Sequence, residues 1–129
     1  MELIIHDFEL PLLHPFTISR ETITVQPSVI VELREGNISG YGEATTNSYY
    51  GATKERLRQS LETCRDLVEN TPWEEPYQLW ELAREQLNDS FALCALDLAA
   101  HDLWGKRLGK PVYELWGLTT ENNPLSNYT

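Results

Sequence analysis

Cationic residues are scarce in this sequence. Its 129 residues include 10 lysines and arginines against 20 aspartates and glutamates, which gives a net charge of −10. A nucleic-acid-binding surface needs positive charge to face the phosphate backbone, and anionic membrane surfaces also attract cations. We therefore expect neither nucleic acid nor a membrane as a partner, and we attribute the acidity to solubility.

Long apolar runs and cysteines are also lacking. No 18 consecutive apolar residues occur, so the sequence predicts no membrane-spanning helix. Residues 1–7 have neither a basic segment nor a long apolar segment, so we expect no secretory signal. Cys64 and Cys94 are too few for a disulfide scaffold, and both lie among apolar residues of expected helices. We predict buried, reduced thiols and a cytoplasmic protein.

The first 45 residues have the composition of β-strands. A length of 129 residues with 41% hydrophobic residues suits one globular domain. Strand-like segments cover residues 2–12, 16–25, 28–34 and 38–44. The turn residues Glu35-Gly36-Asn37 separate the last two, which predicts an antiparallel hairpin. We therefore predict an antiparallel sheet of three or four strands.

The periodicity changes to that of helices after Gly51. Leu57, Leu61 and Cys64 recur at helical spacing, which predicts a helix that begins at the N-cap Thr53 and ends before Pro72. A second helix is predicted over residues 76–87. A third begins at Asp89 or Ser90 and ends at Gly109, and residues 111–115 could add a short turn. The fold class is therefore α+β, with a three- to four-stranded sheet followed by three helices.

The third predicted helix is apolar on nearly every side. Residues 91–100 contain one charged side chain, Asp97. Such a helix is buried on several sides, whereas a small sheet covers only one. Either the first two helices cover the remainder, or a partner outside this chain does, and the sequence leaves both open.

Residue spacing alone reveals no catalytic site. Zinc-ligand spacing, a dinucleotide fingerprint, a phosphate-binding loop and a nucleophile elbow are all absent from the sequence. Asp97 and His101 would share a helix face and could hold a metal, but a structural hydrogen bond is the interpretation we favour. Glu43 could be a lone acid, although the sequence shows no partner group for it.

Two stretches carry a family resemblance. Gly40-Tyr41-Gly42-Glu43-Ala44 resembles the GxGEA strand end of the enolase-superfamily capping domain, in the muconate-lactonizing subgroup. Residues 95–106, with the continuation over 108–118, resemble the third helix and exit turn of that domain. The resemblance extends over the whole chain, and it implies a capping domain over residues 1–116. Residues 117–129 would form a linker and the start of the first strand of a TIM barrel that the sequence does not contain.

The front of the chain is similar to dipeptide epimerases of the L-Ala-D/L-Glu type. The stretch 13–20 (LHPFTISR) resembles their first substrate loop, and residues 45–51 would form the second. In that family an arginine at the position of Arg20 binds an acidic side chain of the dipeptide. Glu21 replaces the glycine of many relatives and can partly neutralise Arg20. The resemblance implies a small dipeptide substrate and these binding residues: Phe16, Ile18, Arg20, Tyr49 and Tyr50.

The same resemblance implies that the catalytic groups lie elsewhere. An epimerase of this type uses two lysines and a Mg²⁺ ion, both supplied by the barrel. This sequence has three lysines, Lys54, Lys106 and Lys110, and none is in a Lys-x-Lys motif. We thus expect no catalytic residue and no metal ligand in this chain, with its own C-terminal barrel as partner; a homo-oligomer stays open. The alternatives are an o-succinylbenzoate synthase, an N-acylamino acid racemase, a muconate cycloisomerase, or a free-standing interaction module.

Overall fold

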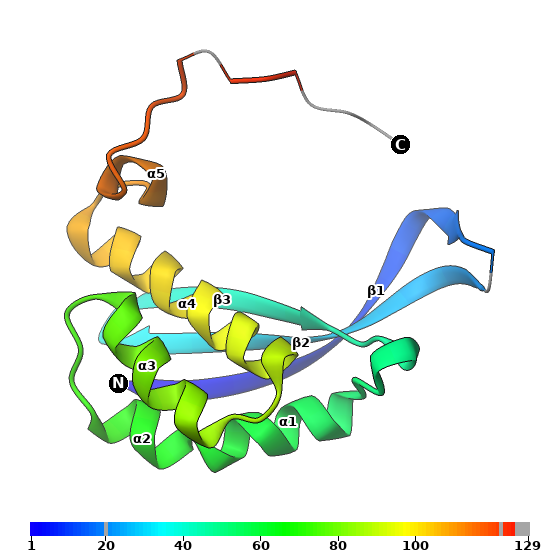
Figure 1. Cartoon of the computed structure of the whole chain (residues 1–129), viewed down its shortest axis with the longest axis horizontal. Coiled ribbons are helices and arrows are strands. Elements are labelled where there is room, and N and C mark those ends of the chain that lie inside the picture. Colours follow the sequence, from blue (N-terminus) through cyan, green and yellow to red (C-terminus); the bar gives the residue numbers. More distant parts are fainter. Residues whose placement is uncertain (20, 122, 126–129) are drawn as a thin grey trace.

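A three-stranded antiparallel sheet is followed by helices, as expected for the α+β class. The computed structural model describes residues 1–19, 21–121 and 123–125. The strands lie in the order β1-β2-β3, and their bounds are β1 Glu2–Thr17, β2 Thr22–Glu35 and β3 Ile38–Thr45. The helices, shown in Figure 1, are η1 Ser48–Tyr50, α1 Lys54–Thr63, α2 Arg65–Asn70, α3 Pro76–Gln86, α4 Ser90–Leu108 and α5 Val112–Leu115.

The first hairpin differs from its prediction. The segment 16–25 is not one strand, because Phe16 pairs with Ile23 and Thr17 with Thr22 across a turn. The preceding pair is Pro11 with Val25. From Pro11 to Phe16 there are five residue steps along β1, which oppose the two steps from Val25 to Ile23 along β2, so β1 contains a bulge. Prolines cannot donate a backbone hydrogen bond to a neighbouring strand, and Pro11 and Pro15 lie at the two ends of this bulge. In Figure 1 the paired ends of β1 and β2 project beyond the end of β3 as a two-stranded ribbon.

Helix α4 packs on the sheet at very short range. Val29, Val31 and Leu33 are fully buried on the face of the sheet that the helices cover. Gly40 and Gly42 lie opposite Leu33 and Val31 on β3, and a Cβ at either position would clash with the backbone of α4. The GxG spacing therefore permits close helix–strand contact, and it serves packing.

The predicted helix caps are confirmed. Thr53 accepts a hydrogen bond from the backbone N–H of Arg56, and Asp89 caps α4 through its side chain. Gly109 ends α4 in the left-handed conformation with φ of 63°. The first predicted helix is interrupted at Cys64, where α1 gives way to α2.

The two cysteines lie in different surroundings. Cys64 is buried as predicted, and burial raises the pKa of its thiol to about 11. The prediction for Cys94 is wrong, because this residue is exposed on the face of α4 that points away from the core. Leu98, four residues along, is 48% exposed on the same helix. Helices α1 and α3 therefore contact α4 but leave the face with Cys94 and Leu98 exposed. Within the described ranges, no helix has both the length and the apolarity needed to cross a bilayer.

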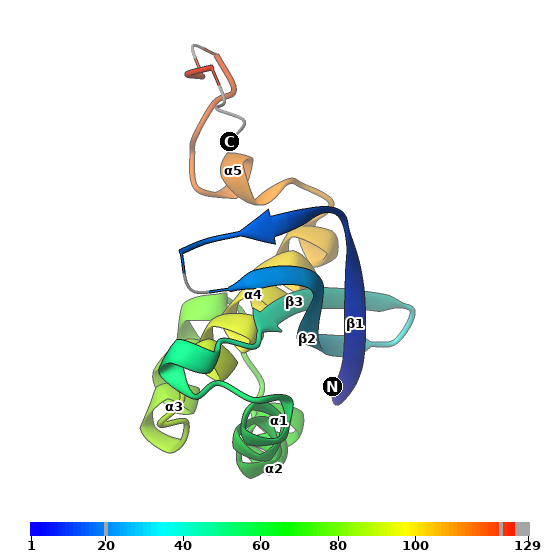
Figure 2. The ribbon, with the colours of Figure 1, turned by 90° about the vertical axis from the view of Figure 1, so that its right-hand side faces the viewer.

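Charged side chains shield both edges of the sheet. On the β1 edge, Glu69 accepts a hydrogen bond from Leu3 N at 3.0 Å, and Arg65 donates one to the Leu3 carbonyl. On the β3 edge, Asp102 Oδ2 accepts from Tyr41 N at 2.8 Å and Lys106 Nζ donates to Ser39 O at 2.7 Å. Figure 2 shows the ribbon of β1 and β2 curling away from this shielded part.

Candidate functional site

The ribbon tip and the segment after β3 enclose a cavity of about 380 Å³. Phe16 and Ile18, two of the expected substrate-binding residues, line it from the ribbon. The other ribbon residues were not predicted as part of the site, although the alternation of Ile23 and Val25 was a usable signal. The remaining lining residues are Glu21, Ile23, Val25, Gln26, Pro27, Thr45, Thr46, Asn47 and Ser48.

A glutamine joins the two walls of this cavity. Gln26 lies where the ribbon leaves the sheet, and its Nε2 donates to the Thr46 carbonyl at 3.2 Å and to the Pro27 carbonyl at 3.0 Å. Thr46 in turn donates to Pro27 O through both its backbone N–H and its hydroxyl, at 3.0 and 3.1 Å. The base of the ribbon and the start of the second loop are therefore held in one arrangement.

The two tyrosines of the second loop lie beside the cavity and not in its lining. Tyr49 and Tyr50 are 72% and 60% exposed on the one-turn helix η1. Their rings meet edge to face with centroids 4.9 Å apart, and the Tyr50 ring lies 5.8 Å from that of Phe91 at the start of α4. Exposed aromatic rings on a fixed loop can contact a ligand or a partner domain.

The remaining expected binding residue, Arg20, lies outside the described residues. Its neighbour Glu21 is described: the Glu21 carbonyl accepts from Ile18 N at 2.9 Å and closes the ribbon turn. Glu21 also lines the cavity, which places a carboxylate in a lining that is apolar on the ribbon side and polar on the side of residues 45–48.

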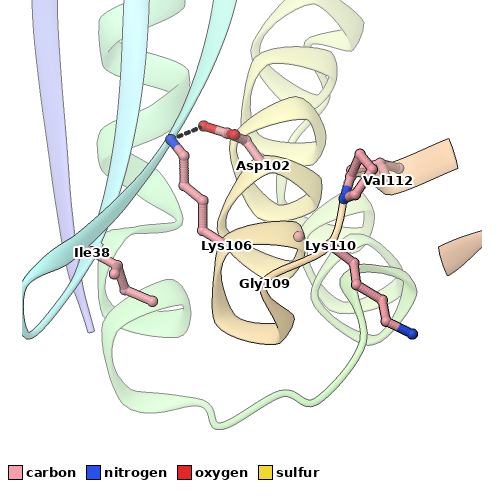
Figure 3. A pocket seen from close by; sticks show the side chains of 8 residues that line it. Ile38, Asp102, Lys106, Gly109, Lys110 and Val112 are labelled. Carbon is pink, nitrogen blue, oxygen red and sulfur yellow. Dashed lines mark hydrogen bonds and ion pairs between the residues drawn. The ribbon is translucent and has the colours of Figure 1, made fainter. Parts of the chain in front are cut away.

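A second cavity, of about 530 Å³, lies between the start of β3 and the C-terminal end of α4. Figure 3 shows Lys106 and Asp102 turned toward one another, while Lys110 points away from this pair. Lys106 Nζ lies 2.7 Å from both Ser39 O and Asp102 Oδ2, so two of its three donors already have partners within the protein. Lys106 and Asp102 belong to the motif that resembles the family helix, and here they join α4 to the edge of β3. We therefore interpret this second cavity as part of the packing between α4 and β3. The candidate site is the first cavity, between the ribbon and residues 45–48.

The remaining candidates from the sequence have structural roles or no partner. His101 Nδ1 lies 2.9 Å from the Asp97 carbonyl and 3.4 Å from Asp97 Oδ1, in agreement with a structural hydrogen bond. Burial raises the pKa of Asp97, and nearby His101 opposes this rise. Glu43 is exposed. Among the residues that the structure describes, no three His, Cys, Asp or Glu side chains form a group that could hold a metal.

The sequence matches a family model over nearly its whole length. Residues 1–117 fit the mandelate racemase/muconate lactonizing enzyme N-terminal domain. The chain belongs to this family. The enolase-superfamily assignment from the GxGEA strand end and the α4 motif is therefore confirmed.

Several relatives of the chain are epimerases. The chain is 51% identical to an L-Ala-D/L-amino acid epimerase of Flavobacterium johnsoniae over its whole length, which is 39% of that protein. It is 35% identical to an L-Ala-D/L-Glu epimerase of Bacteroides thetaiotaomicron, again over its whole length and 34% of the relative. The chain thus spans less than two fifths of these proteins.

Solved structures agree on the fold. A dipeptide epimerase from Cytophaga hutchinsonii, crystallised with Mg and the dipeptide D-Ala-L-Val, superposes with a TM-score of 0.84 at 19% identity. The match covers 98% of this chain and 35% of that one. A sheet followed by helices is therefore the known architecture of this family domain.

Proposed function

We propose that this chain is the substrate-capping domain of a dipeptide epimerase. The observation that carries the proposal is the 51% identity, over the full chain, to an L-Ala-D/L-amino acid epimerase. Because the chain spans 39% of that relative, a barrel domain would account for the remainder. Residues 1–116 would form the cap, and residues 117–129 would lead into the barrel. Two free thiols support a reducing, cytoplasmic location.

The cap would select the dipeptide and exclude water from it. Phe16 and Ile18 offer apolar walls at the ribbon tip, and Tyr49 and Tyr50 offer exposed rings on the adjacent loop. Arg20 would hold an acidic side chain if the substrate carries one. Closing such loops over a barrel lowers the local dielectric, which strengthens the electrostatic interactions of the catalytic groups.

The chemistry itself would be supplied by the barrel. Removing an α-proton and returning it to the other face needs two bases and an electrophile such as Mg²⁺. Among the described residues, no three His, Cys, Asp or Glu side chains form a group that could hold such an ion. Lys54 is ion-paired with Glu9, and Lys106 with Asp102, so neither is a free base. We therefore assign this chain binding and positioning, with no proton-transfer step.

A chimera tests the proposal directly. The N-terminal domain of the Flavobacterium johnsoniae relative would be replaced by this chain, leaving the barrel of that relative unchanged. Exchange of the α-proton would be followed by NMR in D₂O with L-Ala-L-Leu and L-Ala-L-Glu. We expect the chimera to catalyse exchange, the barrel alone to be at least about 100-fold slower, and this chain alone to show none.

Three outcomes separate the alternatives. Exchange by the isolated chain would refute the assignment of chemistry to the barrel. A folded chimera that exchanges no dipeptide but converts a muconate or an N-acylamino acid would transfer the proposal to another reaction of the subgroup. A cap that does not associate with the barrel, by size-exclusion chromatography of the separate domains, would favour a free-standing interaction module.

A further inference from the structure

We propose that Arg56 and Asp89 form a charged clamp that positions the loop 47–52, and with it the rings of Tyr49 and Tyr50. The clamp joins three elements that are distant in sequence: the loop, the first turn of α1 and the N-terminus of α4. Its effect on catalysis rests on the proposed function, whereas its effect on the loop does not.

Backbone hydrogen bonds close the loop at its ends and within η1, where Gly51 N donates to Ser48 O at 3.2 Å. Asn47 and Ala52 exchange two backbone hydrogen bonds, each 2.9 Å long. Inside this closure, Tyr50 N donates to Asn47 Oδ1 at 3.3 Å, and Gly51 adopts a left-handed φ of 63°. These contacts shape the loop, but they do not fix its orientation on the rest of the domain.

Gln26 anchors Thr46 just before the loop, and Arg56 orients the η1 turn within it. The backbone N–H of Arg56 donates to the Thr53 hydroxyl at 3.2 Å, which fixes the residue in the first turn of α1. From there Nη1 donates to the carbonyls of Tyr50 at 3.0 Å and of Gly51 at 3.2 Å. The other side of the same guanidinium lies against Asp89, with Nε 2.7 Å from Oδ2. One planar group therefore connects the loop to α4.

The two carboxylate oxygens of Asp89 make different contacts. Oδ1 caps α4 by accepting from Phe91 N at 3.0 Å and from Ala92 N at 3.2 Å. Oδ2 is buried and makes no well-aligned hydrogen bond, and Arg56 is the cation next to it. The residue is 3% exposed. A buried carboxylate oxygen needs a compensating charge, so Arg56 and Asp89 constrain each other.

The clamp and the ring contact between Tyr50 and Phe91 both restrict the position of the loop 47–52. Capping by Asp89 fixes Phe91, whose ring is 5.8 Å from that of Tyr50, and Tyr50 packs edge to face on Tyr49. A lysine at position 56 has one ammonium group and cannot reach two carbonyls and a carboxylate in this fork geometry.

Two conservative variants test the clamp in this chain. Arg56→Lys keeps the positive charge, and Asp89→Asn keeps an N-cap acceptor while removing the negative charge. For each we expect amide exchange of Ala52 to accelerate about tenfold and the Tyr50–Phe91 ring contacts in NOE spectra to weaken. The amides of Phe91 and Ala92 should stay protected in Asp89→Asn, because its side-chain oxygen still caps α4.

Arg58→Lys is the matched control. Arg58 lies on the same helix and pairs with Asp7 at 2.9 Å, but it does not contact the loop, so Ala52 exchange should not change. Unchanged Ala52 exchange and ring contacts in both clamp variants would overturn the proposal. So would an equal change in Arg58→Lys, since that would report general loosening of α1.

The chimera distinguishes the clamp from the proposed function. There, Arg56→Lys should lower kcat/KM about tenfold with both tyrosines intact, mainly through KM. If the loop loosens while kcat/KM is unchanged, the clamp is supported, and the tyrosines do not belong to the substrate site. A chimera without any activity would count against the proposed function, and the amide-exchange result would still decide on the clamp.

Discussion

A Cβ built on Gly42 would lie 2.0 Å from the backbone oxygen of Ala95, far inside contact distance. The clash is with helix backbone, which cannot rotate away as a side chain could. We expect Gly42→Ala to lower the free energy of unfolding by about 3 kcal/mol, measured by urea denaturation. Gly36→Asn is the control: the space at Gly36 is open, and asparagine tolerates its left-handed φ of 58°. An equal loss in both variants would contradict this account.

Glu32 makes stability depend on pH in the acid range. Burial alone would raise the pKa of this carboxyl, but hydrogen bonds from Ser39, His6 and Arg34 hold the pKa at about 2, against 4.5 for an ordinary glutamate. Because the pKa of Glu32 is lower in the folded state, its carboxylate stabilises the fold fully above pH 4.5. This stabilisation is lost as the pH falls through about 2. Because the His6 and Arg34 side chains are partly exposed, solvent screening reduces this stabilisation to about 1 to 2 kcal/mol.

Urea unfolding of the wild type and Glu32→Gln should show this directly. The difference in unfolding free energy should be constant from pH 7 to 5 and should shrink between pH 4.5 and 2. Glu85→Gln, at an exposed position on α3, serves as control and should show little difference at any pH. A gap between the wild type and Glu32→Gln that persists at pH 2 would show that packing, and not charge, causes the loss.

Arg107 joins three parts of the domain. Its guanidinium lies 3.9 Å from the centre of the Trp73 ring, pairs with Glu35 through Nε at 2.7 Å and Nη2 at 3.1 Å, and donates to the Trp73 carbonyl. Arg107→Lys retains the charge but loses the stacked, two-pronged geometry. We expect a loss of about 1 kcal/mol in thermal or urea unfolding, because Glu35 is partly exposed. Arg84→Lys, near Trp80 on α3, should cost less, since Arg84 is more exposed.

Arg20 can be tested for substrate selection in the chimera. A guanidinium holds a carboxylate through two hydrogen bonds, so Arg20→Ala should lower kcat/KM for L-Ala-L-Glu by roughly 10- to 100-fold. L-Ala-L-Leu should be much less affected. Equal losses on both dipeptides would mean that Arg20 supports the loop without reading the side chain. The absence of any loss would leave selection to Tyr49 and Tyr50.

Local signals predicted much of this fold. Thr53, Asp89 and Gly109 begin or end helices because each satisfies backbone groups within a few residues, and such chemistry is visible in sequence. The turn that follows Ile18 was missed because β-favouring residues lie on both sides of it and no Gly, Pro, Asn or Asp marks it. Pairing across the ribbon decides where the chain turns. The exposure of Cys94 was missed for a related reason: an apolar neighbourhood along the chain does not tell which face of α4 meets the sheet.

The candidate site was predictable only through resemblance. Phe16 and Ile18 do line one cavity with the start of the second loop, but the cavity exists because Gln26 joins segments 20 residues apart. The link from Arg56 to Asp89 spans a longer separation and has no motif that would reveal it. Contacts of this kind depend on packing between elements, which spacing along the chain does not encode.

The shielding of the sheet edges also determines where strands of different molecules can join. Along the β1 edge, backbone groups near Leu3 are occupied by Arg65 and Glu69, and along the β3 edge Asp102 and Lys106 occupy those near Tyr41. A foreign strand would have to displace these side chains before it could add to the sheet. Within the part of the chain that the structure describes, no helix flanks the ribbon that projects beyond β3, and this ribbon carries the exposed Leu13 and Phe16. Side chains in the described ranges do not shield the ribbon in this way, and the two prolines and the bulge of β1 are what oppose strand addition there.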